Sequence, residues 1–420
     1  KKEKSFTIEP NDLIIKVDQP RAVMTQVLFE PNQKLNDSLS YDITAWALPL
    51  AYGVEGYAVK NSLGIKTKAS IAIAEKIVPE SVYAFHIPWN NRTSAQVLAL
   101  LHQNGIKVRS AMREAIFGDI TVKAGSLIVS KADNPKVTDF TKTVNEIVKT
   151  KIDYNFIKTG FSTNSKDLGG ENFALLKAPK IVLLSGNGVG STEFGAVWYY
   201  LDQTIGYPVS IVDVDKFRRI KLYEYNTLIL ADGYYEFSEE QQKQIGEWIK
   251  NGGKVIAMNG ALSLFEGKEG YALSPFASDE DKVKSEKEAD DLELKARIFD
   301  FGNGERRAIS ASIPGAVIEN VLDKSHPMAF GLGDNYFSLK TDDRHYSLLK
   351  KASNVAYIPK DYKSYGFIGN GISKKLNETV SYAVEKKGDG EVVYMIDNPL
   401  FRGFWENGIL LFSNALFLVN

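Results

Sequence analysis

A glycine-rich turn, Gly186-Asn187-Gly188-Val189-Gly190, joins an apolar run to a segment with helical periodicity. Turns of this kind hold phosphates in nucleotide-binding proteins, because glycine lets the backbone approach and the helix N-terminus attracts anions. The dinucleotide fingerprint needs a third glycine where Ser191 stands, although Asp213 could replace its ribose-binding acid. A P-loop lysine is absent from the turn. We therefore predict that the turn mainly reverses the chain, with an anion at the helix start as the alternative.

Polar residues stand at the ends of four predicted strands, which are "KIVLLSG" (180–186), "PVSIVDV" (208–214), "TLILADG" (227–233) and "KVIAMNG" (254–260). The carboxyl ends of parallel strands share one edge of a sheet, and open α/β sheets bind ligands there. Simple capping of loops is the competing explanation for the acidic residues. The candidate ligand cleft consists of Gly186, Asn187, Gly188, Asp213, Asp232 and Asn259.

No residue in a usual nucleophile position can attack a substrate. The chain contains no cysteine, and the G-x-S-x-G motif is absent. Folds of this kind often place a nucleophile at the bend after a central strand, but here that bend carries Asn259-Gly260. An amide is not a nucleophile, so we predict no catalytic residue.

The four histidines do not form a recognisable metal motif. None lies in an H-x-x-E or H-E-x-x-H pattern, and a zinc site needs three or four converging ligands. We therefore predict no metal ligand and no cofactor in this chain. The histidines are His86, His102, His326 and His345.

The bulk composition excludes some partners. The chain has 420 residues, with 51 basic and 52 acidic side chains, so its net charge of -1 offers no field for nucleic acid. No apolar run reaches about 18 residues, so we predict no membrane span. The first residues contain neither methionine nor an apolar signal core, which indicates a fragment of a longer protein.

The predicted elements divide the chain into two domains. Residues 1–165 alternate short apolar runs with helical segments and indicate a mixed α/β domain, whose first 60 residues read as strand-rich. Residues 166–179 are polar, contain glycine and end near a proline, as a linker would. Residues 180–420 begin with regular βαβ units and predict a doubly wound parallel sheet. A densely charged insertion is expected near 279–297.

Aromatic residues gather in the stretch "DNPLFRGFW". Phe401, Phe404 and Trp405 stand beside Arg402, which could form a platform for a ligand. Packing in the core is the explanation that we favour.

Three stretches, "YDITAWALPLAYGVEGYA", "DKSHPMAFG" and "DNPLFRGFW", resemble the C-terminal region of Bacteroidetes zinc carboxypeptidase-like proteins, which belong to the carboxypeptidase A superfamily. The resemblance implies that zinc lies in an upstream peptidase domain, outside this chain. It also implies that residues 180–420 form a flavodoxin-like domain similar to class I glutamine amidotransferases. Those enzymes use a Cys–His–Glu triad, which a chain without cysteine cannot supply.

The resemblance implies a function as well. We expect a non-catalytic accessory region, inactive alone, that scaffolds an upstream peptidase domain or positions its peptide or cell-surface substrate. It further implies an extracytoplasmic location, either periplasmic or at the cell surface. The alternatives are a small-molecule or glycan binding module, and a stand-alone hydrolase that uses acids at the carboxyl edge of the sheet.

Overall fold

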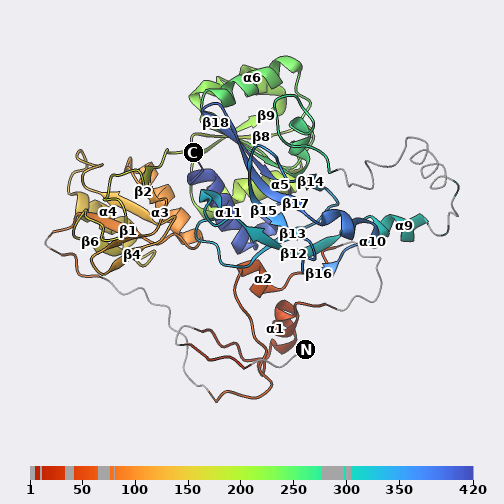
Figure 1. Cartoon of the computed structure of the whole chain (residues 1–420), viewed down its shortest axis with the longest axis horizontal. Coiled ribbons are helices and arrows are strands. Elements are labelled where there is room, and N and C mark those ends of the chain that lie inside the picture. Colours follow the sequence, from red (N-terminus) through yellow and green to blue (C-terminus); the bar gives the residue numbers. More distant parts are fainter. Residues whose placement is uncertain are drawn as a thin grey trace.

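The computed structural model describes residues 5–9, 12–33, 42–64, 76–79, 81–276, 298, 302 and 304–419. These residues form a mixed α/β protein with two main sheets, shown in Figure 1. The charged insertion predicted at 279–297 lies outside the described residues.

The first sheet has five strands, and all of its pairs are antiparallel. In spatial order the strands are β6 (Asn155–Ile157), β1 (Ala84–Ile87), β5 (Leu127–Ser130), β2 (Arg109–Ala111) and β7 (Phe173–Leu175). A hairpin of β3 (Ala115–Phe117) and β4 (Ile120–Val122) lies beside it. Helices α3 (Arg92–Gln103) and α4 (Phe140–Val148) confirm both helices predicted here. Asn91 caps α3, since its side chain accepts a hydrogen bond from the Ser94 N–H at 3.1 Å.

The boundary predicted at 166–179 needs a correction. Residues 173–175 form β7, which pairs with β2. Two backbone hydrogen bonds extend this pairing, from Met112 N–H to Asn172 O and from Leu176 N–H to Val108 O. The polar composition marks a loop correctly, but the short apolar run after the loop completes the first sheet.

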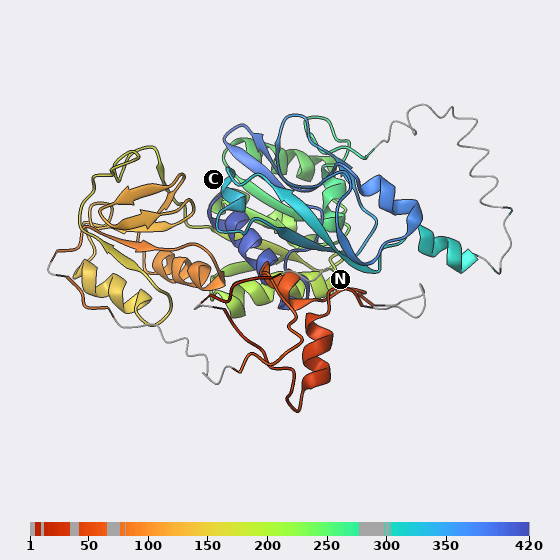
Figure 2. The same cartoon turned by 60° about the horizontal axis from the view of Figure 1, so that its bottom comes forward.

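The prediction of strands in the first 60 residues is wrong. The described part of this segment contains no strand and instead forms helices α1 (Ala22–Phe29) and α2 (Leu48–Tyr52). A strand needs a neighbour for its backbone groups, and α1 lies outside both sheets in Figure 2. Ala45, Ala47 and Ala51 pack against Val317 and Trp405, so residues 43–51 belong with the second unit and not with the first.

The second sheet has eleven strands, and five of them are parallel. In spatial order these are β9 (Val209–Asp213), β8 (Ile181–Ser185), β10 (Thr227–Leu230), β11 (Lys254–Met258) and β18 (Gly390–Met395). Their order by position in the chain is 2-1-3-4-5, as in doubly wound sheets. Helices α5 (Ser191–Tyr199) and α11 (Glu406–Phe417) pack on one face and α6 (Glu239–Lys250) on the other.

The remaining six strands make this sheet mixed, where the sequence predicts a parallel one. β17 pairs antiparallel with β18, and β15, β12 and β13 continue the sheet beyond it. The bounds are β12 (Gly315–Leu322), β13 (Tyr336–Lys340), β14 (Tyr346–Ser347), β15 (Ser353–Ile358), β16 (Ser364–Phe367) and β17 (Thr379–Lys387). Gly388, with φ +65°, reverses the chain between β17 and β18.

Short helices complete the described chain. They are α9 (Gly304–Ser310), α10 (Asn370–Ser373), the π-helical turn η1 (Tyr200–Thr204) and the 3₁₀ turns η2 (Val214–Arg219), η3 (Leu222–Glu224), η4 (Asn259–Leu264), η6 (Pro327–Ala329), η7 (Lys374–Leu376) and η8 (Phe401–Gly403).

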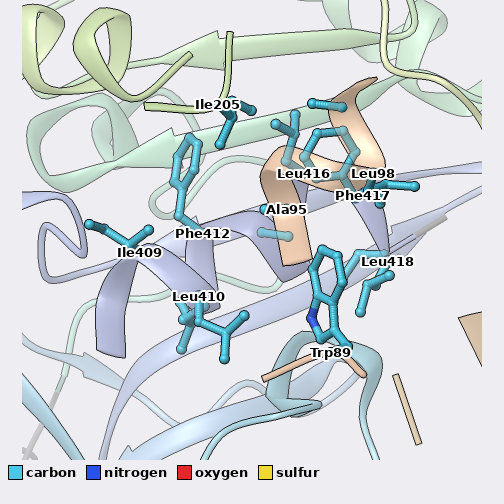
Figure 3. Packing of buried hydrophobic residues seen from close by; sticks show 14 of the residues in the cluster. Trp89, Ala95, Leu98, Ile205, Ile409, Leu410, Phe412, Leu416, Phe417 and Leu418 are labelled. Carbon is cyan, nitrogen blue, oxygen red and sulfur yellow. The ribbon is translucent and has the colours of Figure 1, made fainter. Parts of the chain in front are cut away.

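Helix α11 joins the two units. Figure 3 shows Trp89, Ala95 and Leu98 of the first unit beside Phe412 and Leu416 of α11. The Trp89 indole N–H donates to Asn414 Oδ1 at 2.5 Å. The side chains of α11 are buried all round because the helix packs against both units.

Candidate functional site

The residues of the predicted cleft lie at the carboxyl ends of β8, β9, β10 and β11. The strand order reverses between β8 and β10, and doubly wound sheets bind ligands at such a reversal. The glycine turn follows β8, Asp232 follows β10 and Asn259 follows β11.

The glycine turn packs tightly against the segment after β10. Val189 and Gly233 form an antiparallel bridge, and the Tyr234 N–H donates to Gly188 O at 2.8 Å. Gly188 has φ +79°, and a Cβ there would lie 2.1 Å from Tyr234 O. The N–H of Gly190 is also used, since it donates to Asp232 O at 2.9 Å. This geometry agrees with a turn that reverses the chain.

The start of α5 already holds a negative charge. Glu193 lies in its first turn, and one of its carboxylate oxygens would be 2.4 Å from a Cβ on Gly190. Thr192 Oγ1 donates to that carboxylate at 2.6 Å. An acid in this position interacts favourably with the helix dipole and repels a second anion. The arrangement therefore disfavours the alternative of a bound anion.

Asp213 caps a turn. Its Oδ1 accepts from the Asp215 N–H at 2.9 Å at the start of η2. Its other oxygen would lie 2.7 Å from a Cβ on Gly186, so the carboxylate packs on the glycine backbone. Asn187 is exposed at the tip of the turn.

Asp232 contacts the bend after β11. Its Oδ1 accepts from the Gly260 N–H at 2.7 Å. Burial raises the pKa of Asp232, while this hydrogen bond and the nearby Arg344 oppose the rise. Arg344 pairs with Asp342 at 2.5 Å, and Glu193 and Asp342 add negative charge around Asp232. Sequence reasoning missed Arg344 and Glu193, because neither belongs to a recognisable motif.

Asn259 has the backbone of an elbow. Its φ is +45°, which is uncommon for a residue other than glycine. The side chain is 4% exposed, and its Nδ2 donates to Ile396 O at 3.0 Å. Within the described residues no group donates to its Oδ1. Local strain of this kind clusters at functional positions.

Both polar groups that could act at the elbow already donate hydrogen bonds within the protein. In hydrolases with a nucleophile elbow, the N–H of the residue after the nucleophile helps to stabilise the oxyanion. Here that N–H belongs to Gly260 and already donates to a carboxylate. The preceding side chain is an amide, which points its nitrogen at a main-chain carbonyl.

A buried ion pair lies just beyond the elbow, and sequence reasoning did not find it. Lys340 Nζ is 3.1 Å from Asp397 Oδ1, and the two side chains are 1% and 2% exposed. Ser338 Oγ donates to the other carboxylate oxygen at 2.7 Å. These residues link the antiparallel strands to the end of β18, so we assign them a structural role.

The aromatic side chains of "DNPLFRGFW" pack into an apolar cluster. Trp405 is 1% exposed, and its indole N–H donates to Phe337 O at 2.9 Å. Arg402 lies 5.0 Å from the centre of the Phe401 ring. Phe401 and Phe404 pack against the same cluster, in line with the explanation favoured from the sequence.

The four histidines lie on separate elements. His86 is in β1, His102 in α3, His326 caps η6, and His345 precedes β14. In the part of the chain that the structure describes, no three His, Asp or Glu side chains gather as metal ligands would. In the same residues, no helix combines the length and apolarity needed to cross a bilayer.

No family model matches this chain, and no curated protein sequence matches it. Among solved structures, a ThuA-like protein from Bacteroides uniformis shares 14% identity and a TM-score of 0.33, over 57% of this chain and 91% of that one. A ThuA-like protein from Parabacteroides merdae shares 15% identity and a TM-score of 0.34, over 57% and 89%. A protein described as a GMP synthase component from Thermoplasma acidophilum shares 12% identity, also at 0.34, over 57% and 94%. These TM-scores are too low to support an argument about function.

Proposed function

We propose that this chain is a non-catalytic accessory region of a zinc carboxypeptidase-like protein. In this proposal it scaffolds an upstream peptidase domain or positions its peptide or cell-surface substrate, outside the cytoplasm. We further infer that residues from 180 onward form a flavodoxin-like, glutamine amidotransferase-like domain. The 2-1-3-4-5 strand order and the elbow at Asn259 support this finer assignment.

The elbow is the single observation that carries the proposal. Acyl-transfer catalysis at an elbow needs a nucleophile and a free oxyanion donor. Asn259 supplies no nucleophile, and Asp232 occupies the Gly260 N–H. The negative charge of Asp232 would also repel an oxyanion at that position. A domain with this arrangement keeps the architecture of an enzyme and serves as a scaffold.

Zinc belongs to the upstream domain in this proposal. Zinc bound by histidine and carboxylate ligands needs side chains that converge on one point. The histidines of this chain are dispersed over β1, α3, η6 and the segment before β14. Chemistry that depends on zinc is therefore assigned to residues outside this chain.

Two assays test the proposal together. The purified chain, with zinc added, should not hydrolyse glutamine, an activated ester or a peptide with a free carboxyl end. A peptidase domain joined to this chain should bind a polypeptide substrate more tightly, with a lower KM, than the same domain without it. Equal KM and equal stability of the two forms would contradict the accessory role.

The alternatives give other results in these assays. A stand-alone hydrolase predicts turnover that is lost in Asp232→Asn. A binding module predicts saturable thermal stabilisation by a sugar or small molecule without turnover, weakened by Asn187→Ala at the exposed tip of the glycine turn.

A further inference from the structure

Asn259 and Gly260 form an Asn-Gly pair at the elbow, and a base contacts this pair. The Gly260 N–H donates to the Asp232 carboxylate at 2.7 Å. Gly260 has no side chain to shield its nitrogen, and a Cβ there would lie 2.6 Å from that same carboxylate. The amide of Asn259 is attached to the adjacent residue, so its carbonyl carbon and the Gly260 nitrogen can close a five-membered ring.

We propose that Asn259-Gly260 is a self-modification site. The Gly260 nitrogen attacks the side-chain carbonyl carbon of Asn259 while the Asp232 carboxylate accepts the N–H proton. A bond forms between that nitrogen and Cγ, and the bond from Cγ to Nδ2 breaks. Asp232 returns the proton to Nδ2, which leaves as ammonia. The product is a succinimide, and one water molecule can open it to aspartate or isoaspartate.

Three features of the elbow favour this reaction. The carboxylate already lies within hydrogen-bonding distance of the proton that it must remove, which is the first requirement for a general base. Burial raises the pKa of Asp232 and makes it a better base. Asn259 has a strained backbone and an Oδ1 without a partner among the described residues, so its starting state is poorly stabilised.

The consequence is a change of charge at the elbow. Opening of the succinimide turns the neutral side chain of residue 259 into a carboxylate beside Asp232. Two carboxylates at one buried position repel each other, so the reaction would alter the stability of the bend. This inference is independent of the accessory role proposed above.

The chain contains its own controls. Asn407-Gly408 is also buried, with Asn407 7% exposed, but Gly408 packs on the Pro399 carbonyl. Among the described residues, no carboxylate accepts from the Gly408 N–H. Asn251-Gly252 follows α6, with Asn251 exposed and open space around Gly252, and reports the ordinary surface rate.

The test follows each Asn-Gly pair by peptide mass spectrometry while the folded protein is incubated at mildly alkaline pH in ¹⁸O-labelled water. We expect Asn259 to lose ammonia faster than Asn407 by roughly a hundredfold, the size of a general-base effect. Label should enter the aspartate and isoaspartate products at residue 259. In Asp232→Asn the rate at Asn259 should fall to that of Asn407, while Asn251 reacts as before.

A second measurement does not depend on the variant folding. In denaturant the Asp232 carboxylate leaves Gly260, so the ratio of the rates at Asn259 and Asn407 should approach one. An Asn259 that stays intact in the folded protein while Asn251 reacts would overturn the proposal. An unchanged rate at Asn259 in a folded Asp232→Asn protein would overturn it equally.

Discussion

At the scale of single residues, the buried His86 and the partly buried His102 make the fold sensitive to acid. Burial lowers the pKa of His86 and of His102 to about 4, from an ordinary value of 6.5. The unfolded chain therefore binds more protons between pH 6.5 and 4, and stability falls as the pH decreases through that window. Each histidine should therefore make the free energy of unfolding about 2 kcal/mol lower at pH 5 than at pH 7.5.

Denaturant unfolding at pH 7.5 and pH 5 measures this loss. His102→Phe should remove about 2 kcal/mol of this loss, because the ring stacks on Phe417 and needs no charge. His345→Gln, at a partly exposed site near Phe276, is the matched control. If the free energy of unfolding is the same at both pH values, the explanation is wrong.

The stability of the fold should depend on both partners of the buried ion pair, Lys340 and Asp397. Asp397→Ala leaves the Lys340 ammonium buried, with Asp342 3.6 Å away, and should cost about 3–5 kcal/mol. Asp334→Asn breaks a pair with Lys324 whose side chains are 92% and 47% exposed, and should cost at most about 1 kcal/mol. Chemical denaturation gives the free energy of unfolding of both variants. Equal losses of stability would show that burial of the ion pair has no special role.

Part of the candidate site can be predicted from the sequence. The glycine turn, Asp232 and Asn259 were expected at one edge of the sheet because each follows a parallel strand, and they lie there. Arg344 was not expected, since it comes from the antiparallel extension and no local pattern marks it. The contact between Asp232 and Gly260 also depends on tertiary structure, because it joins the ends of two strands.

At the scale of elements, the N-terminal cap of helix α6 should contribute to the stability of the fold. Ser238 Oγ accepts from the Gln241 N–H at 3.3 Å, and the Gln241 side chain accepts from the Ser238 N–H at 2.9 Å. The spacing of Ser238 and Gln241 in the sequence is typical of such a capping box, which the structure forms. Ser238→Ala should lower the free energy of unfolding by about 1 kcal/mol, whereas Ser238→Asp keeps a cap and should change it little. Equal stability of Ser238→Ala and wild type in thermal melts would count against the cap.

Elements with strong local patterns were predicted, and elements that depend on distant partners were not. The parallel strands are continuous apolar runs because both faces are buried, and α6 carries its own cap and its glycine stop. The antiparallel strands β13 to β17 contain polar side chains that only the finished sheet satisfies, such as Ser338, which contacts Asn320 of β12. Residues 22–29 resemble a strand in composition, but no strand in the described part of the chain pairs with them, and they form α1.

At the scale of the whole molecule, the contact between the two units can be tested at one glycine. Gly331 has φ +75°, and a Cβ there would lie 2.2 Å from Trp89 O of the first unit. Gly331→Ala should lower the free energy of unfolding in two ways. The alanine is strained at this φ, and its Cβ would push the two units apart, which should cost about 1–3 kcal/mol more. Gly267 has a similar φ of +63° in open space, so Gly267→Ala isolates the strain. Urea unfolding of both variants gives the difference, and equal losses would contradict the close contact.

We propose that the Asn259 elbow does not catalyse acyl transfer, because residue 259 is not a nucleophile and the Gly260 N–H already donates to Asp232. The most direct measurement is turnover of glutamine and of an activated ester by the purified wild-type chain, with Asn259→Ala as background. We expect identical rates for the two proteins. Turnover by the wild type that disappears in Asn259→Ala would contradict it.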